Sequence, residues 1–282
     1  MSKKLTILIL GIILSLMMPY ATWAKSVLEA IRQTGVLKVG IRTDAPPFGS
    51  RNNDGEWQGY CIDNMERLAN GLSKKLGREI RLAKVQSTLE NRYQIVADGT
   101  VHLECGPNTT KSNPPVEGIV YSRGFFVTGT HLLVRPESRR RINPNGSLAN
   151  VRIGVLEQSN TYDLISSTYS LADLVTYNGI SGRERGVTDV VDKKSQAFAS
   201  DGVLLLGEAL RQNFTLENYT LIPDQPLSCD FYGMILPAND EKWENTVNQF
   251  INPGTILDSL AESFGSESLY LGITEAALEK CL

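Results

Sequence analysis

The stretch VHLECGPNTTKSNPPVEGIVYSRGFFVTGTHLLV, residues 101–134, decides how the rest of the chain is interpreted. Its segments 101–105 and 125–134 are rich in the β-branched and aromatic residues that favour strands. The loop between them opens with GPNTTK, residues 106–111. This loop places two hydroxyls, an amide and a cation just beyond the end of a strand, where open α/β sheets bind their ligands. The second segment leads to Arg135 and Pro136, where we expect the chain to change lobe.

Residues 1–24 have the features of a secretion signal. Lys3 and Lys4 precede an apolar run of 14 residues, 5–18, and ATWA at 21–24 is a small-residue cleavage site. The apolar run is shorter than the roughly 20 residues that cross a membrane as a helix. We therefore expect cleavage after Ala24, and an uncleaved N-terminal anchor is the alternative.

The charge of the remaining chain excludes one class of function. Removal of residues 1–24 takes away two lysines and no acid, so 258 residues remain with 26 basic and 31 acidic side chains and a formal charge of −5. This balance, without a basic run that has aromatics interleaved, argues against nucleic-acid binding. A chain of this length forms either one large domain or two lobes.

The order of strands and helices predicts the fold class. Strands at 36–42, 80–85 and 101–105 alternate with helices that begin at 62 and 91, which indicates a largely parallel sheet covered on both faces. After a polar segment at 136–150 the pattern restarts, with strands at 151–156, 197–199 and 220–223 and helices at 162–166, 188–193 and 201–212. A strand at 231–236 and a helix at 241–251 are then expected to rejoin the first sheet.

We therefore predict an α/β protein with two lobes. Lobe one is expected to comprise residues 25–134 and 230–282, and lobe two residues 137–224. Two adjacent crossings between the lobes, near 134–137 and 224–230, would form a hinge. A small ligand commonly binds in the cleft beside such a hinge.

Loops at the strand ends that face the predicted cleft suit an anion. Hydroxyls beside the free N–H groups of a helix N-terminus hold a carboxylate well. The candidates are Thr109, Thr110 and Lys111 in lobe one and Ser159, Asn160 and Thr161 in lobe two. The alternatives are simple helix capping for residues 159–161 and a solvated side chain for Lys111.

Asp201 suits a cation. It lies between Ser200 and Gly202 at the end of a predicted strand, although an ordinary N-cap role is the alternative. An acid in one wall, with carboxylate-binding groups in both walls, matches an α-amino acid. We therefore predict this class of ligand.

Four cysteines, at positions 61, 105, 229 and 281, are compatible with two disulfides in an exported chain. They form no CxxC pair, and His102 and His131 stand apart from one another. We therefore expect neither a structural zinc site nor a cofactor.

Five segments in register resemble a known family. They are VGIRTDAPPFG (39–49), GYCIDNMERLA (59–69), HLECGPNTT (102–110), FFVTGTHLLV (125–134) and SQAFASDGVLL (195–205). Together they resemble the family 3 solute-binding proteins of amino-acid ABC transporters, above all the glutamate/aspartate-binding branch, over nearly the whole chain after residue 24. The resemblance implies the type II periplasmic-binding-protein fold, in which a two-segment hinge joins two lobes, each a mainly parallel sheet flanked by helices. The same module forms the ligand-binding core of ionotropic glutamate receptors.

The resemblance also implies roles for individual residues. Asp201 corresponds to the acid that pairs with the ligand's ammonium group. The other implied ligand residues are the hydroxyl pair Thr109 and Thr110, the anion-binding loop Ser159, Asn160 and Thr161, the aromatic Phe48, and Arg42 of the acidic-ligand branch. Without the resemblance, Phe48 is better interpreted as a core residue and Arg42 equally well as a surface charge.

Two positions depart from the family pattern. Lys111 stands where an arginine usually grips the α-carboxylate, and lysine cannot make the forked contact; Arg123, Arg183 or Arg185 are the alternative donors. Cys61 stands where most bacterial members have an acid. The resemblance implies a disulfide between Cys229 and Cys281 and leaves pairing of Cys61 with Cys105 open.

The function implied is that of a monomeric periplasmic protein that binds a polar or acidic L-amino acid and delivers it to the membrane permease of an ABC transporter. No catalytic role is expected. Two alternatives remain at this level. One is a sensory module that signals to a receptor, and the other is an enzyme similar to cyclohexadienyl dehydratase, with Glu104 or Glu157 as the general acid or base.

Overall fold

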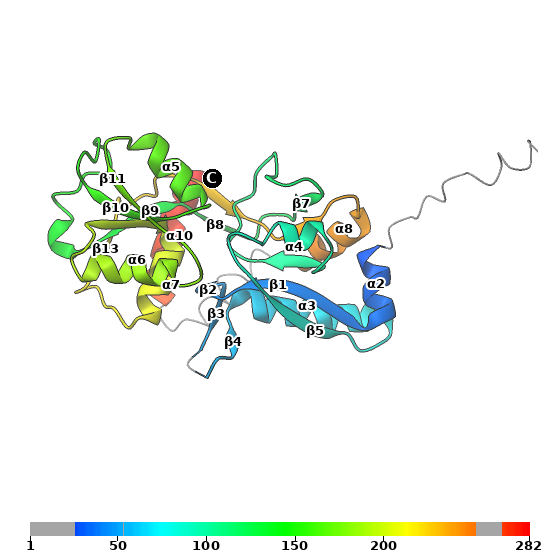
Figure 1. The fold of residues 1–282 in the computed structure, drawn as a ribbon. Helices are drawn as coiled ribbons and strands as arrows, with labels where there is room; N and C mark the ends of the chain where they lie inside the picture. The colour runs from blue at the N-terminus through cyan, green and yellow to red at the C-terminus, as the bar shows by residue number, and fades with distance from the viewer. Residues whose placement is uncertain (1–25, 53, 252–266) are drawn as a thin grey trace, which may run out of the picture.

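A computed structural model describes residues 26–52, 54–251 and 267–282, which form two lobes joined by a hinge (Figure 1). The expected secretion signal, residues 1–24, lies outside the described residues. None of the described helices combines the length and the apolar content that crossing a bilayer requires.

The first lobe contains a five-stranded sheet that the chain completes only on its return from the second lobe. The strand order is β5 (Arg81–Ser87), β1 (Val36–Arg42), β6 (Leu103–Cys105), β15 (Ile235–Pro237) and β7 (Ile119–Tyr121). Strand β1 pairs in parallel with β5 and β6, whereas β15 is antiparallel to β6 and β7. The prediction that the segment after residue 230 rejoins the first sheet is therefore confirmed.

Helices cover this sheet as the apolar spacing indicates. In α3 (Tyr60–Leu76) the residues predicted to form one face, Ile62, Met65, Leu68, Ala69 and Leu72, are all buried, and the helix packs against β1 and β5. The remaining helices of this lobe are α2 (Val27–Thr34), α4 (Gln94–Ala97) and α8 (Glu241–Phe250). A small antiparallel sheet, β2 (Asp44–Ala45), β3 (Gly49–Arg51) and β4 (Trp57–Gln58), precedes α3.

The second lobe repeats the arrangement. Its sheet has the order β11 (Asp173–Tyr177), β10 (Arg152–Leu156), β12 (Ala197–Asp201), β9 (Thr130–Val134) and β13 (Thr220–Ile222). The first three strands are parallel, and β9 is antiparallel to β12 and β13. The helices are α5 (Asn160–Thr168), α6 (Gly182–Val191) and α7 (Gly202–Arg211), and a short 3-10 helix, η1 (Pro136–Ser138), follows β9.

The hinge differs from the expected one. The segment 125–134, predicted as one strand of lobe one, is split into β8 (Phe126–Thr128) and β9, and β9 belongs to the second sheet. Strand β8 pairs with β14 (Asp230–Tyr232) to form the hinge ribbon. The chain changes lobe at Gly129, where a Cβ atom would lie 1.9 Å from the carbonyl oxygen of Ser228. The lobes therefore divide at 129 rather than at the expected 134. The sequence pattern does not mark this point, because every residue of both strands is buried.

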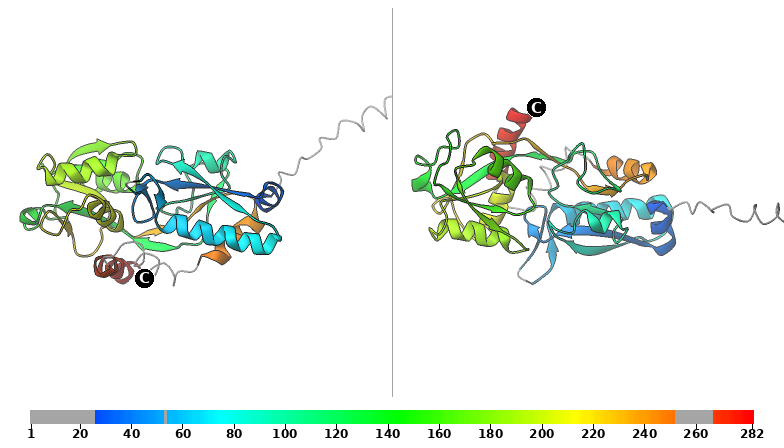
Figure 2. Two further views of the ribbon diagram at one scale, coloured as in Figure 1. Left: turned by 90° about the horizontal axis from the view of Figure 1, so that it is seen from below. Right: turned by 45° about the horizontal axis from the view of Figure 1, so that its top comes forward.

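The C-terminal helix also lies elsewhere than expected. Helix α10 (Glu267–Cys281) was assigned to lobe one, but it packs against hinge strand β8 and against α7 of the second lobe (Figures 1 and 2). The predicted disulfide between Cys229 and Cys281 is present and ties this helix to the hinge. A second disulfide, which the sequence left open, joins Cys61 of α3 to Cys105 of β6.

Candidate ligand-binding site

A cavity of about 40 Å³ lies where the two lobes meet. Its wall in the first lobe comprises Arg42, Leu89, Arg92, Pro107 and Thr109, and its wall in the second comprises Ser159, Asn160, Thr161, Arg183, Ser200, Asp201 and Leu204. One water molecule takes up about 30 Å³ of liquid, whereas ligand pockets measure about 300–1,000 Å³. The described arrangement is therefore a closed one, and admission of an amino acid requires the lobes or side chains to move.

Asp201 is the acid of this cavity. It ends β12 and stands at the N-cap of α7, yet its side chain caps no backbone N–H of that helix. Instead its carboxylate accepts a hydrogen bond from the Tyr232 hydroxyl and a long one, 3.5 Å, from Thr161 Oγ1. Burial, together with repulsion from Asp230, raises the pKa of Asp201 to about 7, although Tyr232, Arg183 and Thr161 oppose the shift. A cation bound here would stabilise the carboxylate.

The loop before α5 combines capping with exposure to the cavity. Ser159 accepts a hydrogen bond from the backbone N–H of Tyr162 at 3.1 Å, which is the capping role that the sequence left as an alternative. Its hydroxyl also donates to the carbonyl of Leu156 at 2.7 Å. Ser159 and Asn160 nevertheless line the cavity, so the N-terminus of α5 faces the space between the lobes.

Two arginines of the first lobe line the cavity, and they differ in whether their N–H groups are paired within the protein. Arg42 is buried and binds the carboxylate of Asp44 with both Nε and Nη2, at 2.7 and 2.6 Å. Burial alone would raise the pKa of Asp44, but the Arg42 guanidinium lowers it below its ordinary value. Arg92, only 7% exposed, donates Nη2 to the hydroxyl of Tyr93 at 3.0 Å, while its Nε and Nη1 have no hydrogen-bond partner among the described residues. Of these two arginines, Arg92 is therefore the one with buried unused donors.

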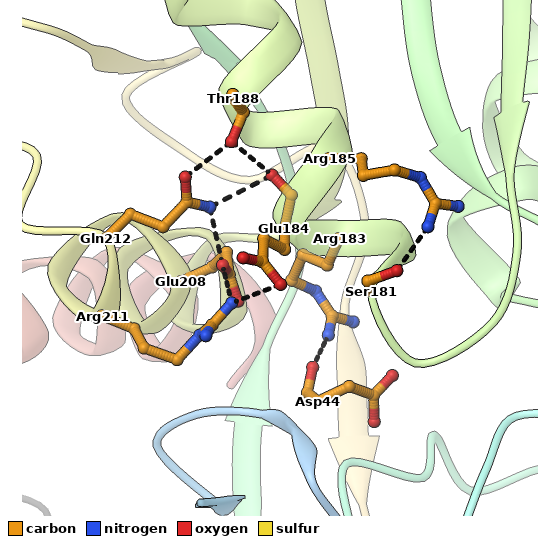
Figure 3. Close-up of polar contacts among 9 residues, drawn as sticks. All are labelled: Asp44, Ser181, Arg183, Glu184, Arg185, Thr188, Glu208, Arg211 and Gln212. Atoms are coloured by element: carbon orange, nitrogen blue, oxygen red, sulfur yellow. Dashed lines mark hydrogen bonds and ion pairs between the residues drawn. The ribbon is translucent and has the colours of Figure 1, made fainter. Parts of the chain in front are cut away.

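A third arginine enters from the second lobe. Arg183, in the first turn of α6, donates Nη1 to the backbone carbonyl of Asp44 in the first lobe, and its Nε has no partner (Figure 3). Burial lowers the pKa of this guanidinium, and the charge of Asp44 partly offsets the effect. Arg183 was one of the alternative donors named from the sequence. The other two, Arg123 and Arg185, do not line the cavity.

Helices α6 and α7 hold Arg183 and Asp201 in a fixed relation. Arg211 of α7 pairs with Glu208 at 2.7 Å and with Glu184 of α6 at 3.2 Å. Gln212 donates to the carbonyl of Glu184 at 3.1 Å and accepts from Thr188 at 2.7 Å (Figure 3). These contacts join the two helices whose N-terminal ends carry Arg183 and Asp201.

Three predicted ligand residues lie outside the cavity. Phe48 is fully buried among the rings of Tyr60, Phe125, Phe126 and Tyr232, with ring centroids 5.2–6.1 Å away. Thr110 and Lys111 line a separate surface groove of about 580 Å³ in the first lobe. Thr109 forms a β-bridge with Tyr232, and successive side chains of an extended chain point to opposite sides, so Thr109 and Thr110 diverge.

Arg92 is the charged residue of the cavity that sequence reasoning missed. It stands in the loop that leads into α4, inside a segment that was expected to be an ordinary helix. No local pattern distinguishes it from the many solvated arginines of the chain.

Comparison with known proteins identifies the family of the chain. The family model of bacterial extracellular solute-binding proteins, family 3, matches residues 37–254. The glutamate/aspartate import solute-binding protein of Salmonella typhimurium is 25% identical over 231 residues, which cover 81% of this chain and 74% of the relative. The glutamine-binding protein of Geobacillus stearothermophilus is 31% identical over 209 residues, which cover 73% of this chain and 74% of the relative.

Solved structures share the fold. An ancestral amino-acid-binding protein, described as a precursor of cyclohexadienyl dehydratase, superposes with a TM-score of 0.70 at 19% identity and covers 85% of this chain and 99% of its own. An amino-acid ABC transporter substrate-binding protein from Streptococcus pneumoniae, bound to L-arginine, also gives a TM-score of 0.70 at 19% identity, with 86% and 98% covered. The two lobes, the cavity between them and the match over residues 37–254 lead to one conclusion: the chain belongs to the bacterial extracellular solute-binding proteins of family 3.

Proposed function

We propose that this protein is the periplasmic substrate-binding component of an ABC-type uptake system, that it binds an acidic L-amino acid, glutamate or aspartate, between its lobes, and that it delivers this ligand to a membrane permease. The glutamate/aspartate-binding proteins among its relatives support the ligand class. The charged side chains of the cavity give a second argument, which does not depend on these relatives.

The main support for an acidic ligand is the set of ionisable side chains that line the cavity. These are Arg42, Arg92, Arg183 and Asp201. The charge of Arg42 is matched within the protein by Asp44, its bidentate partner. Two guanidiniums and one carboxylate then remain for a ligand, and both guanidiniums have buried N–H groups without a partner. A dicarboxylic amino acid offers the complementary set of two carboxylates and one ammonium.

In the proposed complex, Asp201 pairs with the ammonium group, and Arg92 and Arg183 each bind a carboxylate. Guanidiniums suit this role because their planar fork matches a carboxylate. Ligand groups on both walls favour the closed arrangement. A ligand with micromolar affinity supplies about 8 kcal/mol, and only the part that favours the closed over the open form moves the lobes.

The position of the two candidate catalytic acids supports binding rather than catalysis. Glu104 is fully buried, accepts hydrogen bonds from Ser87 and Asn108, and does not line the cavity. Glu157 is exposed on the surface and is likewise absent from the cavity wall. A general acid or base must reach the substrate, and neither side chain meets that requirement here.

Isothermal titration of the purified protein with the twenty amino acids tests the proposal. L-glutamate or L-aspartate is expected to bind most tightly, with L-glutamine weaker because it lacks one charge. Lys111→Ala is the control, since Lys111 is exposed and lies in the other groove, and its affinity should equal that of the unaltered protein. Preference for arginine or lysine over glutamate would contradict the proposed ligand class.

A further inference from the structure

Hinge strand β14 contacts a cavity-lining residue from each lobe. The Tyr232 hydroxyl donates to Asp201 Oδ2 of the second lobe. Two residues earlier, Asp230 Oδ1 accepts a hydrogen bond from Thr109 Oγ1 of the first lobe at 3.1 Å. Asp201 and Thr109 line the cavity from opposite sides, so one three-residue strand connects the two walls.

Both side chains are held in place by the hinge itself. The Tyr232 ring packs against Phe48 and Phe126, with centroids 5.4 and 6.0 Å away, and its carbonyl accepts from the backbone N–H of Phe125 at 2.8 Å. The second carboxylate oxygen of Asp230 accepts from Ser228, whose hydroxyl oxygen also accepts from the backbone N–H of Thr130 at 3.0 Å. The orientation of both groups is therefore set by the hinge ribbon.

We propose that Tyr232 and Asp230 are positioning residues of the ammonium site and that, from the hinge strand, they act on Asp201 in opposite directions. The Tyr232 hydroxyl stabilises the carboxylate by donating to it. Asp230 and Tyr232 are both buried and Phe231 between them is exposed, so both side chains leave the same face of β14, and the negative charge of Asp230 destabilises the carboxylate that Tyr232 contacts. Neither residue lines the cavity, so neither is expected to touch the ligand. The inference rests on the proposed function only in assigning the ammonium group to Asp201.

The charged groups around Asp201 decide how strongly Tyr232 and Asp230 can alter its protonation. The charged groups that face it are Arg183 of α6, which favours the carboxylate, and Asp230 of β14, which opposes it. Arg42 and Arg92 line the same cavity from the first lobe. On the neighbouring strand β9, burial lowers the pKa of His131 below its ordinary value, which disfavours a positive charge on this ring. Because the pKa of Asp201 is about 7, small changes in its surroundings alter its charge at neutral pH.

The direct test is the carboxyl ¹³C titration of Asp201 in the ligand-free protein, with the resonance identified by its loss in Asp201→Asn. Tyr232→Phe should move the titration midpoint up by about one pH unit, and Asp230→Asn should move it down by about one unit. Tyr60→Phe is the matched control, because Tyr60 packs in the same aromatic cluster, stacked on Phe125, and should leave the midpoint unchanged.

Binding of L-glutamate gives the second readout. The pH below which affinity falls should shift in the same two opposite directions in Tyr232→Phe and Asp230→Asn. Equal losses of affinity at every pH, with an unmoved Asp201 titration, would show a merely structural role and overturn the inference. Should L-glutamate fail to bind even the unaltered protein, the proposed function fails, and the carboxyl titration still decides the inference.

Discussion

The guanidinium of Arg183, in the second lobe, donates a hydrogen bond to the backbone carbonyl of Asp44, in the first lobe. The same Asp44 binds Arg42 through its side chain. A single residue of the first lobe thus engages an arginine from each side of the cavity. Arg183 is therefore expected both to favour the closed arrangement and to bind a carboxylate.

Arg183→Ala should weaken L-glutamate binding by about 10- to 100-fold, because hydrogen bonds to charged groups contribute about 1.5–3 kcal/mol. The ligand-free variant should also have a larger radius of gyration by small-angle X-ray scattering. Arg185→Ala is the matched control, since Arg185 is exposed and donates only to Ser181 and Asn178 of its own lobe. Unchanged affinity and unchanged dimensions in Arg183→Ala would contradict the assignment.

Asp201→Asn should abolish amino-acid binding and yet raise stability at high pH. The folded pKa of Asp201, about 7, lies above its ordinary value of 3.8. The folded state therefore binds more protons between these values, and stability falls as pH rises through about 7. Asparagine has no such penalty, so the variant should gain up to about 4 kcal/mol at pH 8 and nothing at pH 4. Urea unfolding at both pH values measures the difference, and an equal change at both would refute it.

Arg92→Met should lower the affinity for L-glutamate without lowering the stability of the ligand-free protein. Loss of the guanidinium is expected to reduce L-glutamate affinity by about 10- to 100-fold, since a charged hydrogen bond is lost. The ligand-free variant should be at least as stable as the unaltered protein, because Nε and Nη1 of Arg92 are buried without partners and each such group costs about 1–3 kcal/mol. Calorimetric titration and thermal unfolding measure the two effects. A large drop in melting temperature would show that Arg92 supports the fold instead.

Gly129→Ala should disrupt the hinge. The added methyl would meet the carbonyl oxygen of Ser228 at 1.9 Å, and the strands must shift to relieve the clash, at about 1–3 kcal/mol. Gly272→Ala is the control, because a Cβ there meets nothing within 4 Å and alanine favours a helix over glycine by about 1 kcal/mol. Thermal unfolding should therefore move in opposite directions for the two variants. A neutral Gly129→Ala would show that the crossing tolerates a side chain.

Local sequence pattern predicted most of the architecture because regular elements bury one periodic face. The apolar spacing of α3 and the β-branched run of β1 were sufficient for those elements. By contrast, no strand was assigned at Asp173–Tyr177 or at Ile119–Tyr121, both of which lie at sheet edges and are only partly buried. The division of residues 125–134 into two strands at Gly129 was not predicted, because one continuous segment contributes a strand to each of two sheets. The point of division is marked by the close packing of Gly129 against the carbonyl of Ser228, a contact distant in sequence.

Local sequence pattern predicted residues of the candidate site where their role follows from a position at the end of a strand or at the start of a helix. Asp201 at a strand end and residues 159–161 at a helix start lie in the cavity wall. Arg183 was harder to single out because it contacts Asp44 of the other lobe, and Arg92 because it stands in an irregular loop, and neither situation leaves a local pattern. Phe48, taken from the family resemblance, and Lys111, taken from the polar loop after the strand, lie outside the cavity, since their orientation depends on the packing of the hinge and of the loop that follows Thr109.

The small volume of the interlobe cavity is expected to limit the rate of ligand binding. Since about 40 Å³ cannot admit an amino acid, a ligand enters only after the molecule has opened. The observed association rate should then rise with L-glutamate concentration and level off at the rate of opening. The rate of ligand capture is then set by the rate at which the lobes open. A substitution that weakens the contact between the lobes should therefore speed up both the binding and the release of the ligand.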